Sequence, residues 1–347
     1  MSSLPVTLEG PRESLASRLS TVAAMALVAW IGWHVLRWAV VDATWHAVSA
    51  DQCSAAGACW AVIRARYRLL LFGLYPPEEQ WRAALAGGVA IATLLALCWK
   101  RMWRVRVLVG LFLAAPVAFV LLMYGGLPGM PLVPTDRWGG LALTLFLYLI
   151  GIVLGMPLGV VLALLRRSHR RPIAAGAAFV VDTVRTLPMV MILFTVGVLA
   201  PMAFPDGFAG DKLWRVAIAF AFAFGCYQSE IVRAGLQAVA SGQDEAARAL
   251  ALTPYQRMRL VLLPQALTNG LPATVNLLVA TFKETSIVAI IGYFDFASSA
   301  QAAYGNADWA GAYVEVYLFV AAVYFGFATV IGWLGHRIER RVRIDRS

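Results

Sequence analysis

The sequence "SGQDEAARALALTPYQRMRLVLLPQAL", residues 241–267, is a charged segment inside an otherwise apolar chain. Apolar stretches long enough to cross a membrane lie on both sides of it. Its charged side chains are Asp244, Glu245, Arg248, Arg257 and Arg259. In a chain with membrane-spanning stretches, a charged segment of this kind is expected at the membrane surface. The capping and turn residues of the segment predict its local structure.

The first half of the segment is predicted to be a short helix. Ser241 is a suitable N-cap, and Asp244 and Glu245 fall in the first turn, where the helix dipole favours anions. Asp244 precedes Arg248 by four residues, a spacing that supports an ion pair on the exposed face. The opposite face carries alanine and leucine, so we expect a small, smooth surface there.

The second half is predicted to be another helix. Thr253 is placed as N-cap, Pro254 as the first helical residue, and Gln256 completes a capping box. Leu263-Pro264 is expected to end this helix. The pattern indicates a short αα-hairpin. Such a hairpin either inserts into a cleft of another protein or is an amphipathic loop that rests on the membrane.

Composition indicates a polytopic helical membrane protein. Hydrophobic residues make up 61% of the chain and charged residues 14%. We expect about eight spans, each able to cross a bilayer core of about 30 Å. Their approximate ranges are 21–41, 83–99, 107–124, 139–165, 178–203, 213–232, 271–293 and 313–334. We expect an uncleaved first span.

The arginines predict the orientation of these spans. Most of them fall in alternate loops, such as Arg166, Arg167, Arg170 and Arg171, or after residue 334. The positive-inside rule therefore predicts that both termini lie on the cytoplasmic side of the membrane. Charge placed in this way also argues against nucleic acid as a partner of this basic chain.

One outer loop, residues 42–82, conflicts with this rule, because it carries Arg64, Arg66, Arg68 and Arg82. Either residues 60–76 form an amphipathic helix on the outer membrane surface, or the loop packs against the bundle of spans. Cys53 and Cys59 lie in the same loop, as a disulfide or as two free thiols.

The chain lacks the motifs of an enzyme. None of its lysines follows a glycine, so it has no phosphate-binding P-loop. Its four histidines are scattered, and no serine lies in a G-x-S-x-G turn. We expect neither catalysis nor a cofactor in this chain.

Residues 245–264, "EAARALALTPYQRMRLVLLP", resemble the EAA loop of the membrane subunits of bacterial ATP-binding-cassette (ABC) importers. Ala251 stands where that family usually has glycine, and Val261 where it has isoleucine. Residues 137–168 and 184–191 also resemble this family, and residues 227–243 and 277–292 resemble its polar amino-acid (HisM/HisQ-like) branch. In residues 184–191, "VRTLPMVM", Thr186 replaces a glycine. The N-terminal extension is similar to that of the general L-amino-acid importer permeases.

This resemblance implies three regions. Residues 1–137 would be an extension with three spans, residues 138–336 a MetI-like permease core, and residues 337–347 a basic cytoplasmic tail. The hairpin at 241–267 would couple the core to a separate ATPase subunit, which binds ATP and Mg. Its coupling residues would be Glu245, Ala246, Ala247, Ala251 and Pro264.

The resemblance also implies the partners and the function. The chain would translocate L-amino acids of broad specificity as a permease subunit, beside a sister permease or a second copy of itself. A periplasmic amino-acid-binding protein would deliver the substrate. The alternative is a secondary transporter driven by an ion gradient, which has no need of a cytoplasmic hairpin.

Charged residues inside the predicted spans need a reason, because each costs about 2.5–3.5 kcal/mol near the bilayer centre. Asp182 with Arg185, and Glu230 with Arg233, are three apart and able to pair. The charges either hold helices in register or line the translocation path. The candidate path residues are Arg185, Glu230, Lys283, Glu284, Thr285 and Ser286.

We expect Lys283, with its hydroxyl neighbours, to meet a substrate carboxylate, and Glu230 or Glu284 to meet its ammonium group. In the fourth span, Gly151, Gly155 and Gly159 are spaced by four, which allows close helix approach. That face meets either another subunit or a helix of the same chain.

Overall fold

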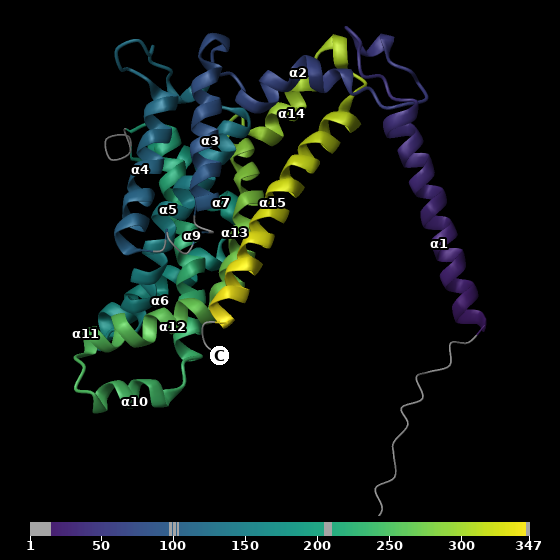
Figure 1. Ribbon diagram of the computed structural model, residues 1–347. Coiled ribbons are helices and arrows are strands. Elements are labelled where there is room, and N and C mark those ends of the chain that lie inside the picture. The colour runs from purple at the N-terminus through teal and green to yellow at the C-terminus, as the bar shows by residue number, and fades with distance from the viewer. Residues whose placement is uncertain (1–14, 97–98, 100–101, 103, 205–209, 345–347) are drawn as a thin grey trace, which may run out of the picture.

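The computed structural model describes residues 15–96, 99, 102, 104–204 and 210–344. Across these residues it is helical, with two isolated bridges and no strand (Figure 1). All eight predicted segments fall on helices, which confirms the all-α fold. These helices are α1 (Leu15–Leu36), α3 (Gln80–Ala96), α4 (Val105–Tyr124), α5 (Gly140–Arg166), α6 (Arg171–Thr186) with α7 (Met189–Phe194), α9 (Lys212–Gln237), α13 (Leu271–Glu284) and α15 (Tyr313–Ile344).

By length and hydropathy, four helical segments of the described chain are able to cross a membrane, and a bent pair adds a fifth. The four are Leu15–Val41, Gly140–Arg166, Leu271–Ile291 and Tyr313–Arg340. Helices α3, α4 and α9 cover the other three predicted spans as shorter or less apolar helices. The helix α15 also runs on through the predicted basic tail as far as Ile344.

The predicted span 178–203 is wrong as one continuous helix. Helix α6 ends at Thr186, and the chain bends by 105° before the segment Met189–Ala203. Leu187 is extended, with φ −85° and ψ 137°. The residue before a proline avoids the helical region and Pro188 has no N–H, so the ladder breaks at this dipeptide.

Helices α5 and α9 form the centre of the bundle. A Cβ added at Gly155 would lie 2.5 Å from Cδ1 of Phe224, and one at Gly159 would lie 2.7 Å from Cβ of Gln228. Gly151 faces the ring of Phe220 in the same way, at 3.1 Å. The glycine face of α5 therefore packs on a helix of the same chain, the second of the two alternatives.

The two ends of the molecule differ (Figure 1). The start of α1, the end of α15 and the predicted hairpin lie at one end, and helices α2 (Ala61–Phe72) and α14 (Phe296–Tyr304) lie at the other. In the orientation expected from the arginines, these are the inner and outer ends.

The outer loop 42–82 contains a helix that packs on the bundle. Helix α2 contacts α5 and α14, and its residues Ala61, Val62 and Leu70 are buried. Both alternatives for this loop were therefore correct in part: it has the predicted helix, but the apolar face of that helix is covered by protein.

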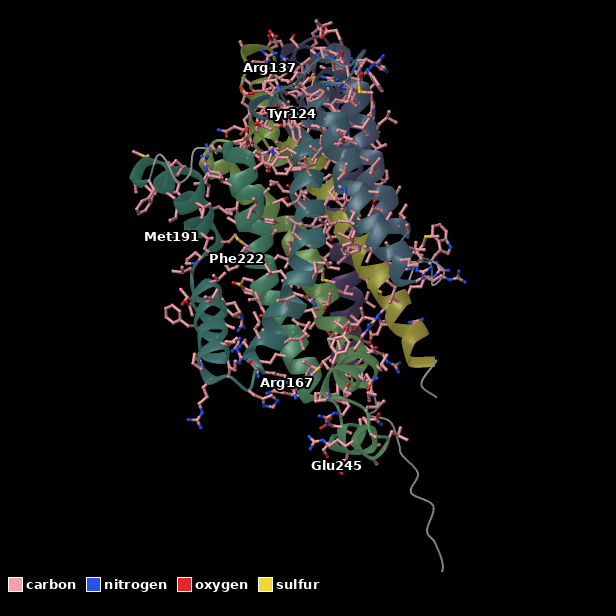
Figure 2. All side chains as sticks on the ribbon, turned by 90° about the vertical axis from the view of Figure 1, so that its left-hand side faces the viewer. Tyr124, Arg137, Arg167, Met191, Phe222 and Glu245 are labelled. Atoms are coloured by element: carbon pink, nitrogen blue, oxygen red, sulfur yellow. A yellow bond between two sulfur atoms is a disulfide. The ribbon has the colours of Figure 1, made fainter. Side chains whose placement is uncertain are left out.

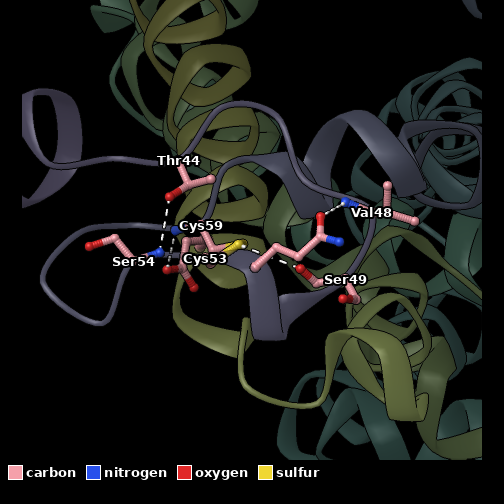
Figure 3. The surroundings of a disulfide bond; sticks show 8 residues. Thr44, Val48, Ser49, Cys53, Ser54 and Cys59 are labelled. Atoms are coloured by element: carbon pink, nitrogen blue, oxygen red, sulfur yellow. Dashed lines mark hydrogen bonds between the residues drawn. A yellow bond between two sulfur atoms is a disulfide. The ribbon is translucent and has the colours of Figure 1, made fainter.

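The loop before α2 is tied down at several points (Figure 3). Cys53 and Cys59 form a disulfide, with Cα atoms 5.6 Å apart. The backbone N–H of Cys59 donates to Oε1 of Glu315 on α15 over 2.8 Å, and that of Ser54 donates to Oγ1 of Thr44 over 3.1 Å. We refer to residues 42–82 as the outer cap.

One of the conflicting arginines, Arg82, is a structural residue. Its side chain is fully buried and donates to the hydroxyl of Tyr75 over 2.8 Å and to the carbonyl of Pro131 over 2.9 Å. Its Nε lies 3.3 Å from a carboxylate oxygen of Glu79. Arg82 thus joins the start of α3 to the loop after α4.

Helix α1 stands apart from the bundle (Figure 1). None of its residues is buried. It joins the outer cap through a π-helical turn at Arg37–Val41, where Nε of Arg37 lies 2.9 Å from Oδ2 of Asp42.

Candidate coupling site and membrane charges

The charged segment forms the predicted hairpin at the inner end of the bundle. Its elements are α10 (Ser241–Ala249), α11 (Pro254–Arg257), a π-helical turn (Met258–Leu262) and α12 (Leu263–Asn269). The capping box of Thr253 and Gln256 is confirmed. Figure 2 shows Glu245 at this end of the molecule and Arg137 at the other.

Asp244 holds the two helices of the hairpin together. Its Oδ2 accepts from Arg248 over 2.7 Å, as the spacing predicted, and its Oδ1 accepts from Arg257 on α11 over 2.9 Å. The Arg248 guanidinium lowers the pKa of Asp244, and Arg257 acts in the same direction. Local spacing does not predict the second bond, because it joins residues 13 positions apart.

Two helix boundaries in the hairpin differ from the prediction. The N-cap is Ala240, without a side-chain bond, and Ser241 is already helical. The second helix does not end at Leu263-Pro264 but continues to Asn269. The π-helical turn before Pro264 explains this, because a wider turn accommodates a proline that has no N–H to donate.

The hairpin exposes most of the predicted coupling residues. Glu245, Ala246, Ala251 and Pro264 are exposed. Ala247 is 3% exposed, so its side chain is buried within this chain. The hairpin also exposes large apolar side chains that were not among the predicted coupling residues: Leu250, Tyr255 and Leu260 are 75%, 69% and 61% exposed. Exposed apolar groups beside a charged rim are typical of a protein interface.

Ala251 has the one positive φ among the described non-glycine residues, at 55°. Its N–H donates to the carbonyl of Arg248 over 2.8 Å, and that of Leu252 donates to the carbonyl of Ala247 over 3.2 Å. These two bonds form a Schellman motif, in which the left-handed position is usually glycine.

The hairpin is packed tightly onto the membrane helices. A Cβ added at Gly235 of α9 would lie 2.2 Å from the carbonyl oxygen of Ala266 in α12. Ala266 also packs with Ala163 of α5 and with Val232 and Leu236 of α9 in one buried cluster. A displacement of the hairpin would therefore move α9 directly.

Glu230 is the centre of an ion-pair network near the inner end of the bundle. It accepts from Arg166 over 2.9 Å and from Nε of Arg233 over 2.9 Å, and it lies 3.7 Å from Arg185. Asp182 pairs with Arg166 over 3.3 Å. The Glu230–Arg233 pair is thus confirmed, and the network joins α5, α6 and α9.

The expected pair of Asp182 with Arg185 is not formed in the described chain. Asp182 and Arg185 both belong to α6. Asp182 pairs instead with Arg166, which lies on the neighbouring helix α5. Arg185 turns instead toward the ring of Tyr227, whose centroid lies 5.9 Å from its Cζ.

The other candidate path residues lie apart from this network. Lys283 is exposed and lines a cleft of about 390 Å³ between α13 and α15, with Asn276, His336 and Glu339. Thr285 is fully buried and donates to the carbonyl of Phe282, and Ser286 donates to that of Lys283. Glu284 is half-buried.

The predicted path residues therefore fall into two groups. Arg185 and Glu230 meet among α5, α6 and α9, whereas Lys283 belongs to the cleft of α13 and α15. A second cleft, of about 650 Å³, is lined mainly by apolar side chains of α6, α7 and α9, and includes Met191 and Phe222 (Figure 2). Its apolar lining carries no signal that a charge-based search of the sequence would find.

Comparisons with known proteins agree with this architecture. The inner membrane amino-acid ABC transporter permease protein YhdY of Escherichia coli (strain K12) is 36% identical over 92% of this chain and 88% of its own. The glutamate/glutamine/aspartate/asparagine transport system permease protein BztC of Rhodobacter capsulatus is 31% identical over 94% of this chain and 90% of its own.

A solved structure and a family model extend the likeness. The crystal structure of an amino acid ABC transporter with histidines superposes with a TM-score of 0.51 at 34% identity, over 58% of this chain and 92% of that one. The model of the binding-protein-dependent transport system inner membrane component matches residues 155–344. The chain belongs to this family, and it is a permease subunit of an ABC importer.

Proposed function

We propose that this chain forms part of the pathway by which an importer moves L-amino acids of broad specificity across a bacterial inner membrane. The names of its relatives support an amino-acid substrate, since YhdY is called an amino-acid permease and BztC is named for four amino acids. Both relatives match the N-terminal extension as well as the core.

The observation that carries the proposal is the hairpin of α10 to α12. It projects from the inner end of the bundle, it exposes Glu245, Leu250 and Tyr255, and its last helix, α12, is packed against α9. We infer that a separate ATPase subunit, which binds ATP and Mg, receives this surface. A partner that holds the hairpin differently in two states would shift the equilibrium between two arrangements of the membrane helices.

The proposal includes the rest of the assembly. Residues 1–137 form an extension, residues 138–336 the permease core and residues 337–347 a basic tail, with both termini cytoplasmic. A sister permease completes the pore, and a periplasmic amino-acid-binding protein delivers the substrate. The bare surface of α1 supports a larger membrane complex, because no other described helix of this chain covers it.

A pull-down tests the coupling role. The tagged chain, purified in mild detergent from its own cells, should bring an ATPase and a second permease with it. Glu245→Arg should lose the ATPase and keep the second permease, because the reversed charge lies on the docking surface. Glu78→Arg, the same change at an exposed acid of the outer cap, should keep both.

Uptake measurements separate this function from its rival. An ABC importer in proteoliposomes needs ATP and is indifferent to a collapsed ion gradient. Uptake that persists without ATP and stops with the gradient would favour the secondary transporter. Purification of the chain alone, with or without Glu245→Arg, would also contradict the coupling role.

A further inference from the structure

Two arginines of the outer cap are not neutralised by an acidic side chain of the described residues. Arg82 is buried in its own hydrogen bonds, and Arg66 lies 3.9 Å from Asp308. Arg64 and Arg68 are exposed and have no acidic partner among the described residues. Because arginine is disfavoured in short outer loops, these two charges need another explanation.

Arg64 lines a cleft of about 540 Å³ between residues 45–52 and the first turns of α2. We call this cleft the outer socket. Its wall also includes Trp45, His46, Val48 and Gln52. The Arg64 guanidinium donates to Nδ1 of His46. The guanidinium is always charged, so the socket carries the positive charge of Arg64.

The outer socket is held in a fixed shape. One wall, residues 45–52, runs directly into the loop that the Cys53–Cys59 disulfide closes and that is bonded to Glu315. Trp45 of this wall stacks on the ring of Trp60, with centroids 6.3 Å apart. The other wall is α2, anchored on the bundle by its buried residues. A preorganised site loses little conformational entropy when a partner binds.

The free face of α2 is directed away from the bundle. Arg64 and Arg68 are four residues apart, with exposed Tyr67 beside them, on the side of the helix opposite buried Val62 and Leu70. Helix α2 lies above α14 at this end of the molecule (Figure 1). A helix bound to lipid would bury its apolar face in the bilayer, but this one buries it in protein. Arginine and tyrosine are typical anchors of protein interfaces.

We propose that the outer socket receives an acidic side chain of the extracytoplasmic solute-binding protein, with Arg64 as the charge that pairs with it and Arg68 as a neighbouring contact. The inference rests on the proposed function and on the outer location of the cap. It assigns the outer cap, which lies outside the region matched by the family model, a role in docking.

The test uses the complete importer complex in proteoliposomes. The solute-binding protein is the one from the same cells that stimulates the ATPase activity of the complex, and this activity is measured against its concentration. The half-saturating concentration of that protein should rise about tenfold or more with Arg64→Glu, since a like charge then faces the acid. Arg64→Lys, which keeps the charge, should shift it much less. Arg137→Glu, the same reversal at an exposed outer arginine outside the cap, should leave it unchanged.

Salt supplies a second measurement that does not depend on the fold of a charge-reversed variant. The half-saturating concentration of the wild type should rise with salt, and the milder Arg64→Gln should weaken that dependence. Equal values and equal salt dependence for wild type and Arg64→Gln would overturn the socket.

Two further outcomes also decide against it. If the effect of Arg64→Glu vanished in vesicles of neutral phosphatidylcholine, the arginine would serve anionic lipid. A lower maximal rate with an unchanged half-saturating concentration would also refute docking at this point. A wild-type complex that ignores the binding protein would instead refute the proposed function itself.

Discussion

Ala251 is strained at the point where the hairpin turns. Its left-handed backbone costs a residue with a Cβ about 1–2 kcal/mol, a cost that glycine does not bear. The hydrogen bonds of the Schellman motif hold the conformation nevertheless. The methyl group is also exposed, so it lies on the surface that we assign to the ATPase.

Replacing this residue should therefore stabilise the turn. We expect Ala251→Gly to slow hydrogen exchange at the Leu252 amide by roughly fivefold, which corresponds to about 1 kcal/mol. The matched control is Ala249→Gly, the same change two residues earlier in regular helix, which should speed the exchange. Slower exchange in both variants, or in neither, would contradict the assigned strain.

The membrane charges show what a sequence can predict about single residues. Glu230 and Arg233 were paired correctly because helix geometry places residues three apart on one face. Asp182 was paired with the wrong arginine, since its partner Arg166 belongs to another helix and packing decided between them. Local spacing thus identified the charged cluster but could not assign all of its bonds.

At the scale of elements, the contact between α5 and α9 depends on glycine. We expect Gly155→Ala to destabilise the protein by about 1–3 kcal/mol, because its methyl would lie 2.5 Å from Phe224 and 2.7 Å from the backbone oxygen of Ala221. The buried thiol of Cys226 on α9 reports unfolding by its reaction with a thiol dye, in a Cys98→Ser background.

Gly88→Ala on α3 is the control, because nothing lies within 4 Å of a Cβ built there. It should melt at or above the temperature of the parent, while Gly155→Ala melts several degrees lower. Equal melting of the two variants would mean that α5 and α9 are not in close contact in the detergent-solubilised protein.

Element boundaries were the weakest part of the sequence prediction. Pro188 and Pro264 each follow a leucine, but they have opposite effects. The helix ends before Pro188, where Leu187 is extended, whereas it continues through Pro264 after a π-helical turn. Both outcomes are compatible with the missing N–H, and the packing around each proline selects one. The presence of the helices was predicted correctly, because a long apolar run in a membrane must form a helix whatever its neighbours are.

At the scale of the whole molecule, the hairpin and the outer cap lie at opposite ends of the bundle (Figure 1). The charges of the predicted path belong to α6, α9 and α13, which are helices of the bundle between these ends. Within that middle region, the network of Glu230 and the exposed Lys283 have different surroundings. The difference predicts which charge maintains the fold and which serves transport.

Glu230→Gln should lower stability, because it removes the carboxylate shared by Arg166, Arg185 and Arg233 and leaves like charges together. Losing one partner of a buried pair costs about 3–5 kcal/mol, and the partial exposure of Glu230 places it at or below the lower end. Any loss of uptake in this variant should follow the loss of folded protein.

Lys283→Met should have the opposite profile. Lys283 is exposed in its cleft and forms no salt bridge among the described residues, so its loss should leave the melting temperature unchanged or raised. If its ammonium group meets the substrate carboxylate, uptake per folded complex should fall at least tenfold and the preference among amino acids should change, while binding of the ATPase persists. Unchanged uptake and preference at equal protein level would remove Lys283 from the path and leave the apolar cleft of α6, α7 and α9 as the place to look next.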